Sequence, residues 1–543
     1  MGGNVIGVTL SVGRPMSLGL AQRQGDLLDD MSWFCDQSLP EGSVYRFLHR
    51  ERDRLFPDEV FADLFTERGR RSVPPSVVAT VMVLQRLEGL SDREAVERYT
   101  FDSRWRYAAG VGSYDTGGWG RFAHTVLVDM RERLRRSDDE DRILRVGMEA
   151  AREAGVVGLR RVLDSTPLYD AVATMDTVTL IRSALRELLA VADPKLEAEL
   201  RGVLSSGDDY ATSAKPQIDW DDPAAREEVI DSRAKDAFAC LALLDGRELD
   251  PPVAQAAALL AAVCGQDLEE DDGVFRIARK VTKDRIISTV DPEARHGHKT
   301  QARGFDGYKG HAAIDPDSEI ITAATVTPAN AGDATVAEDL IEDLLTDEED
   351  TDDDEERPKV FGDSAYGGGD FQKTLEDHDI DSGCKTQPPS PPAGGLFPKN
   401  RFQINLEDDT VTCPGQVTVT IRRHQHGGGL ATFGDACDAC PLRTQCTNAK
   451  AGRAIRVSVH EAVLARAHER QADPAWRADY RANRPKVERK LAHLMRRKHG
   501  GRRARMRGRA KIGADFRLLA AAHNIARFAT LGMRSTPQGW ALA

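Results

Sequence analysis

Long apolar segments are missing from this 543-residue chain, and with them the usual signature of a membrane protein. The best apolar run, from Val253 to Cys264, is shorter than the roughly 20 residues that a spanning helix needs, and it contains Gln255. The N-terminus has no basic flank before an apolar stretch, so no secretion signal is expected. These absences predict a cytoplasmic protein.

A disulfide framework is also not expected, because cytoplasmic thiols stay reduced. The eight cysteines are therefore predicted to be free thiols or metal ligands. Four have no partner pattern and are predicted to be buried or incidental; these are Cys35, Cys240, Cys264 and Cys384.

The other four cysteines cluster in a segment with few large apolar residues; they are Cys413, Cys437, Cys440 and Cys446. The Cys-x-x-Cys turn presents two sulfurs to one ion, and the other two cysteines complete a tetrahedral zinc shell. His424 and His426 are alternative ligands, while free thiols or an iron–sulfur site are the alternatives to zinc. We predict structural zinc, because little apolar surface is otherwise available to hold this segment together.

A general excess of positive charge is absent too: the net charge is −13, which argues weakly against a nucleic-acid partner. The charge is segregated, however. Between Arg481 and Ile512, fourteen Lys or Arg residues stand with a single acid, Glu488, which gives a local balance of +13. This basic tract suits DNA phosphates, and a solvated helical face is the alternative. The acidic run from Asp347 to Glu356 is predicted to be a solvated loop.

Helical and strand-like patterns divide the chain into segments. Pro74-Pro75 precedes a helix that Ser76 is placed to open, and Ser91-Asp-Arg-Glu94 is a capping box. This all-helical N-terminal domain is expected to bind DNA or pair subunits, with a stabilising cap as the alternative. Further on, Thr179–Val191 is one amphipathic helix, and another is expected near Ala334–Leu345.

The strand-like runs are Leu159–Thr166, a hairpin from Gly310 to Val326 around the turn residues Asp315–Ser318, and Lys359–Asp363. Together with the helices they predict an α/β fold, a mixed sheet interrupted by insertions. The expected segments are a flexible leader at 1–42, the N-terminal helical domain at 43–135, the catalytic core at 155–175 and 286–383, a mostly helical insertion at 176–285, the cysteine-bearing insert at 384–450, and C-terminal helices with the basic tract at 451–543.

Two of the strand-like runs end in an aspartate followed by serine, at Asp164 and Asp363. If the strands end side by side, both carboxylates meet at one sheet edge, where hard cations such as Mg²⁺ find oxygen ligands. Two such ions roughly 4 Å apart can activate water and stabilise a leaving 3′-oxygen in phosphoryl transfer. A turn or a helix cap is the structural alternative for either aspartate alone.

Glu488 is the third candidate, because it is the single acid of the basic tract. We expect it on a helix whose first turn holds Asn483 and Pro485. It should stand beside a buried stripe formed by Val487, Leu491 and Leu494, and so face the sheet edge. The alternative is a surface ion pair with Arg484 or Arg489.

In order and combination, these residues resemble the DDE transposases of bacterial and archaeal insertion sequences, of the type with an InsH-like N-terminal helical domain. The resemblance runs from about Ser43 to the C-terminus. It is carried by Val162-Leu-Asp164-Ser-Thr166, Gly304-Phe-Asp-Gly-Tyr-Lys-Gly-His311, Thr327-Pro-Ala-Asn330-Ala-Gly-Asp333, Phe361-Gly-Asp363-Ser-Ala-Tyr366-Gly367 and Arg484-Pro-Lys-Val-Glu488.

The resemblance implies an RNase H-like fold with Asp164 on the first strand, Asp363 on the fourth and Glu488 on a late helix, binding two Mg²⁺ or Mn²⁺ ions. It implies binding of terminal inverted repeats, metal-dependent cleavage, joining of 3′-OH ends to target double-stranded DNA, and a homodimer located at the nucleoid when bound. The residues expected at DNA phosphates are Arg484, Arg489, Lys490, Arg496 and Arg497.

One part of the family pattern is altered here. The family often shows Tyr, two residues, Arg, three residues, Glu, six residues and then Lys or Arg. Tyr480 stands one position early, and Met495 takes the basic position, with Arg496 just after it. Residues between 291 and 311, including Lys309 and His311, either orient the site, contact DNA or form a polar hairpin approach. A zinc-stabilised DNA-binding regulator without catalysis is the competing function.

Overall fold

The structure is a computed structural model that describes residues 30–66, 68–112, 118–280, 282–300, 302–345, 357–389 and 394–543. The acidic run predicted as a loop lies wholly outside these residues, as do residues 1–29 of the predicted leader. The described end of that leader forms a helix, α1 (Asp30–Ser38). No helix in the described ranges is both long and apolar enough to cross a membrane.

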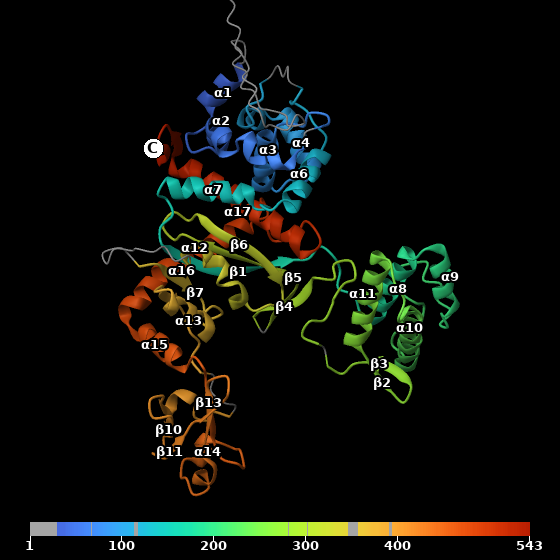
Figure 1. The fold of residues 1–543 in the computed structure, drawn as a ribbon, viewed down its shortest axis with the longest axis vertical. Helices are drawn as coiled ribbons and strands as arrows, with labels where there is room; N and C mark the ends of the chain where they lie inside the picture. Colours follow the sequence, from blue (N-terminus) through green and yellow to red (C-terminus); the bar gives the residue numbers. More distant parts are fainter. Residues whose placement is uncertain are drawn as a thin grey trace, which may run out of the picture.

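A mixed sheet stands at the centre of the molecule (Figure 1). Its strands are β1 (Arg160–Tyr169), β4 (Arg295–Thr300), β5 (Arg303–Ile314), β6 (Ile321–Pro328), β7 (Lys359–Gly362) and β8 (Asp381–Cys384). The order is β4-β5-β1-β7-β8, and β6 also pairs with β5. The β5 strand is antiparallel to β1, β4 and β6, whereas β7 is parallel to both β1 and β8. Both faces are covered, since Val162 and Leu163 of β1 enter different apolar clusters.

The predicted hairpin is present as β5 and β6. The carboxylate of Asp315 holds the turn by accepting hydrogen bonds from the backbone of Asp317 and Ser318 and from the Ser318 hydroxyl. The first half of β5 was missed, because its glycines carry little strand propensity. Two of them are required by close packing: a Cβ at Gly307 would lie 2.4 Å from the Leu168 carbonyl oxygen, and one at Gly310 would lie 2.8 Å from the Phe516 ring.

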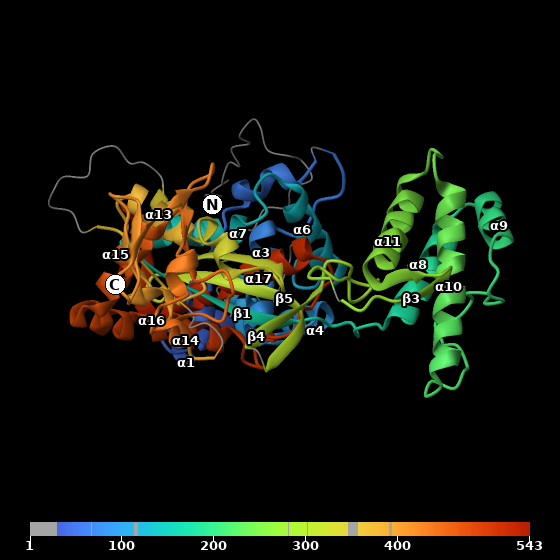
Figure 2. The same cartoon turned by 90° about the horizontal axis from the view of Figure 1, so that it is seen from below.

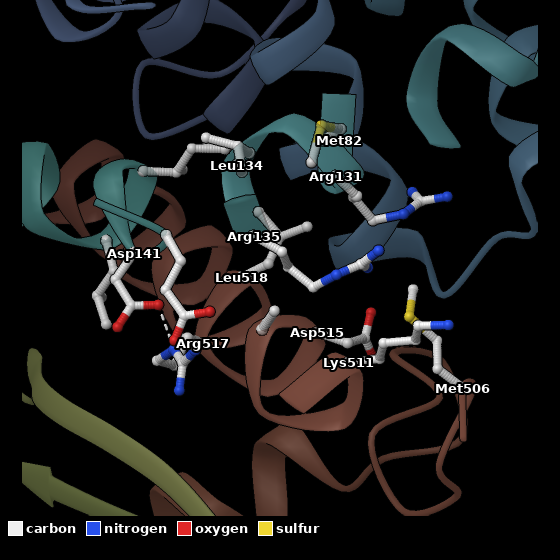
Figure 3. A pocket seen from close by; sticks show the side chains of 14 residues that line it. Met82, Arg131, Leu134, Arg135, Asp141, Met506, Lys511, Asp515, Arg517 and Leu518 are labelled. Carbon is white, nitrogen blue, oxygen red and sulfur yellow. Dashed lines mark hydrogen bonds and ion pairs between the residues drawn. The ribbon is translucent and has the colours of Figure 1, made fainter. Parts of the chain in front are cut away.

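Helix α17 (Arg509–Leu531) packs between the sheet and the N-terminal helices (Figure 1). The Asn524 side chain fixes it to the sheet, because its amide donates to the Ile321 carbonyl and its oxygen accepts from the Ile321 N–H, both at 2.8 Å. On the other side, Arg517 bridges to Asp141 (Figure 3) and to Glu140. Asp515 of the same helix lies 3.2 Å from Arg86. The core and the N-terminal domain are therefore joined through one long helix.

The N-terminal domain is helical, as predicted. It contains α2 (Val44–Leu55), η1 (Asp58–Leu64), α3 (Pro75–Glu88), α4 (Asp92–Phe101), α5 (Ser103–Ala108), α6 (Thr125–Arg136) and α7 (Arg142–Glu153). The capping box of Ser91 and Glu94 is confirmed at the start of α4. Helix α3 begins at Pro75 with Pro74 as its N-cap, so Ser76 does not open it. All but the last residue of α3 are buried, which makes this helix the centre of the domain.

Two further lobes stand away from the sheet (Figures 1 and 2). One contains α8 (Thr177–Val191), α9 (Pro194–Gly202), α10 (Pro223–Leu244), α11 (Pro251–Asp267) and the hairpin of β2 (Leu268–Asp271) and β3 (Val274–Ile277). The other holds the cysteine cluster on β9 (Gln403–Asn405), β10 (Thr410–Thr412), β11 (Thr418–Thr420), β12 (Arg422–Arg423), β13 (Gly429–Thr432), β14 (Ala454–Val457) and α14 (Arg443–Cys446). Each lobe has its own apolar cluster.

Two helix predictions need correction. The helix expected at 334–345 is broken into η2 (Asp333–Val336), η3 (Asp339–Ile341) and α12 (Glu342–Leu345), because Leu340 and Ile341 turn into the core beside β6. The helix of Glu488, α16 (Pro474–Leu494), begins eleven residues before Pro485, so Asn483 and Pro485 are not in its first turn. Pro485 has no N–H to donate to the carbonyl of Arg481, four residues earlier. Both residues are exposed, so this carbonyl can accept a hydrogen bond from water instead.

Helices α13 (Gly369–Asp377), which lies between β7 and β8 in the sequence, and α15 (Glu461–Ala472) complete the core. The last two strands, β15 (Met533–Thr536) and β16 (Gly539–Leu542), form a hairpin. Helix α16 packs against β1 and β7. This packing brings a late helix to the strands that carry the two aspartates.

Candidate active site

Asp164 and Asp363 are placed by neighbouring strands. Strands β1 and β7 run parallel, with Val162 opposite Phe361, so each aspartate lies two residues beyond this pair. Asp363 directly follows the end of β7, as predicted. Asp164 does not end its strand, because β1 continues to Tyr169 and pairs Asp164 with Ala312 of β5. The two carboxylates therefore belong to one edge of the β1–β7 pair.

Arg484 brings all three predicted carboxylates together. It extends from α16, and its Nη2 lies 2.8 Å from Asp164 Oδ1 and 3.8 Å from Asp363 Oδ2. Its Nη1 lies 3.4 Å from Glu488 Oε1, one turn along the same helix. The Arg484 side chain is only 7% exposed, whereas that of Glu488 is 62% exposed. The carboxylates thus surround a buried cation from three directions and remain open to solvent on the Glu488 side.

The helix that carries Glu488 is fixed by the stripe that the sequence predicted. Val487, Leu491 and Leu494 are all buried, with at most 3% of each residue exposed. Glu488 stands next to this stripe, and its ion pair with Arg484 was the alternative considered for it from the sequence. In this setting the ion pair is part of the carboxylate cluster.

The electrostatics of the cluster are set by burial and by Arg484. Burial raises the pKa of Asp164, Arg484 opposes this rise, and the nearby Asp363 adds to it. Burial lowers the pKa of the Arg484 guanidinium, but the adjacent carboxylates outweigh it and hold the pKa above its ordinary value. The three carboxylates and one guanidinium carry a formal charge of −2. Arg484 Nε and Nη1 are buried without a hydrogen-bond partner.

This set of donors fits a hard divalent cation. Mg²⁺ and Mn²⁺ prefer oxygen ligands and keep several waters, so a few carboxylates on a partly open face suffice. The position between the carboxylates is already occupied by the positive charge of Arg484, and the cluster still has a formal charge of −2, which attracts divalent cations. Asp164, Asp363 and Glu488 are the residues that can hold it.

A polar network lies beside the cluster on β5 and the loop after β6. Asp333 accepts hydrogen bonds from Lys309 Nζ at 2.7 Å and from the hydroxyl of Ser165, the neighbour of Asp164, at 2.6 Å. His311 Nε2 lies 2.8 Å from Thr327 Oγ1, and its Nδ1 lies 3.5 Å from the Tyr366 hydroxyl. Burial lowers the pKa of His311 to about 4, so the ring is neutral at pH 7.

The sequence did not single out Asp333 or Tyr366 as site residues, although both lie in the motifs quoted above. Lys309 and His311 had been left outside the catalytic set. The sequence alone could not place Lys309 and His311 beside the carboxylates, because their position depends on the register of the strands. In that register, His311 of β5 pairs with Ser165 of β1.

The residues predicted at DNA phosphates do not form one group. Arg484 and Lys490 are buried, and Arg489 pairs with Glu319. Burial lowers the pKa of Lys490 to about 8. Arg484 is directed at the carboxylates and not at solvent, which corrects its assignment to DNA. Arg496 and Arg497 are exposed, and neither forms an ion pair with another described residue. Exposed cations continue beyond them at Lys498, Arg502, Arg503, Arg507, Arg509 and Lys511.

The four clustered cysteines line one pocket in their lobe, together with Phe402, Phe433 and Arg453. The Arg453 N–H donates to Cys437 Sγ at 3.4 Å. Among the described residues no three of these sulfurs lie within 4.8 Å of one another, so the pocket gathers the thiols without closing a coordination shell. His424 and His426 are exposed and do not line this pocket.

Two family models match the chain. The model described as "Transposase DDE domain" matches residues 412–529, which include the cysteine cluster, Arg484 and Glu488 but neither aspartate. The model described as "Transposase domain (DUF772)" matches residues 33–133, the larger part of the N-terminal helical domain. A DDE domain implies an RNase H-like fold and a general use of divalent metal ions, and the mixed sheet agrees with that fold. No curated protein and no solved structure matched the chain.

Proposed function

We propose that this chain is a DDE transposase of an insertion sequence, which its matches to two transposase family models support. In this proposal Asp164, Asp363 and Glu488 are the catalytic carboxylates with which it cuts and joins DNA. In this proposal it binds the terminal inverted repeats of its element, hydrolyses phosphodiester bonds at the ends, and joins the freed 3′-OH to target DNA. The observation that supports it is the convergence of three carboxylates, far apart in the sequence, on one buried guanidinium.

Each residue has a stated role in the proposal. Two Mg²⁺ or Mn²⁺ ions held by the three carboxylates would supply activation of water and stabilisation of the leaving 3′-oxygen. Arg484 orients Asp164 through its 2.8 Å contact and balances part of the charge before ions arrive. Asp333 holds Ser165 and Lys309 in place, which keeps β1 and β5 in fixed positions beside Asp164.

The proposed DNA surface is the exposed part of the basic tract. Arg496 and Arg497 belong to it, and Arg489 can join it by leaving the exposed ion pair with Glu319, since such pairs are weak. Arg489 lies on the active-site helix, and Arg496 and Arg497 follow that helix directly, so a duplex on them would lie near the carboxylates. A homodimer is proposed because two ends must be paired, and the protein would be at the nucleoid when bound to DNA.

A structural zinc ion in the cysteine lobe is a separate part of the proposal. It is supported by the common pocket of Cys413, Cys437, Cys440 and Cys446 and by the N–H group directed at Cys437 Sγ. Four thiolates would close around the ion by small rotations of the side chains.

The test uses a labelled duplex that carries the inverted repeats flanking the gene. Cleavage is measured in Mg²⁺, Mn²⁺ and EDTA for the wild type, Asp164→Asn, Asp363→Asn and Glu488→Gln. The exposed Glu407→Gln in the cysteine lobe is the matched control. End-specific cutting that needs metal and is lost in the three variants but not in the control supports the proposal.

The competing function, a DNA-binding regulator, predicts another outcome. Such a regulator would still bind the repeats in EDTA and would not cleave them in either Mg²⁺ or Mn²⁺. The three substitutions would leave its DNA binding unchanged. That pattern would remove the catalytic assignment.

A further inference from the structure

Three histidines meet where the core joins the N-terminal domain. His493 lies in the last turn of α16, His499 lies in the turn that follows, and His523 lies in the middle of α17. Their ligand nitrogens all lie within 4.8 Å of one another, and their ring centroids are 4.5–5.2 Å apart. Among the described residues, no other set of three His, Cys, Asp or Glu side chains meets that distance.

The two inner histidines carry unsatisfied polar atoms. His499 is 3% exposed and His523 is 5% exposed, and Nε2 of each is buried without a hydrogen-bond partner. A buried polar nitrogen without a partner costs about 1–3 kcal/mol. No protein group satisfies these two nitrogens, and they lie in the same cluster, so one bound ligand could satisfy both.

The contact of His499 with α3 fixes its tautomer. Nδ1 lies 2.6 Å from the Leu87 carbonyl oxygen. A carbonyl oxygen only accepts, so Nδ1 carries the hydrogen and donates it, which leaves Nε2 with a free lone pair. Histidines that bind metals usually donate their other N–H to a carbonyl or carboxylate in this manner.

From these contacts we propose that His493, His499 and His523 form a transition-metal site, with Zn²⁺ or another divalent ion that prefers imidazole as its ligand. Zinc–nitrogen bonds of 2.0–2.1 Å place tetrahedral ligands roughly 3.4 Å apart. The three nitrogens therefore need to approach by about 1.4 Å at most, which small side-chain rotations supply. His493 is only partly buried, so the fourth position opens toward solvent.

The charges around the site set its preference for the fourth ligand. Burial lowers the pKa of all three histidines, and so do cations from the elements packed around them, which favours the neutral ring that a metal ligand needs. The cations that face the cluster are Arg86, Lys490, Arg496 and Lys498. They also oppose a divalent ion, which favours an anionic fourth ligand such as hydroxide or a phosphate oxygen.

A metal here would fasten the active-site helix to the N-terminal domain. His493 lies five residues after Glu488 on α16. His499 contacts α3 twice, because its carbonyl also accepts a hydrogen bond from Arg86 at 3.2 Å. The backbone is equally close, since a Cβ at Gly89 would lie 2.5 Å from the Lys498 carbonyl oxygen. The site is independent of the proposed catalysis, because none of its ligands belongs to the carboxylate cluster.

The experiment titrates metal-free full-length protein with Co²⁺ in a Cys437→Ser, Cys440→Ser background, so that the cysteine lobe does not compete. Absorption spectra are recorded for this background and for His493→Gln, with His468→Gln, which is partly buried like His493 but lies outside the cluster, as matched control. His493 is chosen because it is the least buried of the three, and circular dichroism confirms that the variant folds.

One equivalent of Co²⁺ should bind with a tetrahedral spectrum that lacks thiolate charge-transfer bands. His493→Gln should weaken this binding by at least about tenfold, since even loss of a supporting group costs that much. Excess Mg²⁺ should not compete, because it prefers oxygen ligands. Equal Co²⁺ affinity in His493→Gln and in the control, or no tetrahedral spectrum in any variant, would overturn the proposal. Neither readout depends on DNA cleavage. A failure of the metal-site proposal can therefore be told apart from a failure of the proposed function.

Discussion

Arg484 occupies the position that a divalent cation would share, and replacing it tests the charge balance of the site. Among the described residues, Arg484 is the one cation in contact with all three carboxylates, and Arg484→Gln changes the formal charge of the cluster from −2 to −3. One positive charge about 4 Å from a divalent ion opposes it by about 2 kcal/mol in a water-like medium, and by more in the protein interior. Mn²⁺ should therefore bind the variant at least about 30-fold more tightly, since each 1.4 kcal/mol is a factor of ten.

The same substitution should lower stability when metal is absent. Removing one partner of a buried ion pair leaves the other charge uncompensated, at a cost of about 3–5 kcal/mol. The Asp164 side chain is 16% exposed, so the cost should lie at the lower end of that range. Saturating Ca²⁺, which also takes oxygen ligands, should recover most of this loss in Arg484→Gln and add little to the wild type.

The assay combines Mn²⁺ titration by electron paramagnetic resonance with thermal unfolding at several Ca²⁺ concentrations. Arg489→Gln is the matched control, because Arg489 pairs with Glu319 outside the cluster. Equal or weaker Mn²⁺ binding by Arg484→Gln than by the control would refute the reasoning. It would mean that Arg484 assembles the carboxylates and does not compete with the ion.

Three further predictions concern stability and DNA binding. Burial holds the pKa of His311 at about 4 in the folded protein, against an ordinary 6.5. The neutral ring therefore contributes fully to stability above pH 6.5. This contribution, about 3 kcal/mol in all, is lost as the pH falls toward 4. Denaturant unfolding at pH 7.5 and 5 should show this loss, and His311→Gln should reduce it. Arg496→Gln with Arg497→Gln should lower the slope of log K against log salt by about 2, whatever the DNA sequence, in filter binding. Ser91→Ala should destabilise the N-terminal domain by about 1 kcal/mol in denaturant unfolding, because it removes the capping box, and an unchanged midpoint would argue against that contribution.

Local patterns were sufficient to predict several elements. The capping box at Ser91, the turn at Asp315, the strand before Asp363 and the buried stripe around Glu488 are encoded within a few residues, and the structure contains all four. Helix α16 was placed too late, because Pro485 resembles a helix start and its exposed position is visible only in the fold.

Long-range relations could not be predicted in the same way. The pairing of β1 with β7 joins residues about 200 positions apart, and no local signal fixes its register. The role of Arg484 depends on the same pairing, since its position in a basic tract suggested DNA contact. The three histidines have no motif in common, because a turn and two helices bring them together.

The order in which the site residues occur along the chain has a consequence for biosynthesis. Asp164 emerges from the ribosome early, Asp363 emerges after the helical lobe, and Arg484 and Glu488 follow only after the cysteine lobe. A chain interrupted between Asp363 and α16 carries both aspartates but lacks the helix that completes the cluster. If the three carboxylates cut DNA as proposed, the order of the sequence alone keeps unfinished copies inactive.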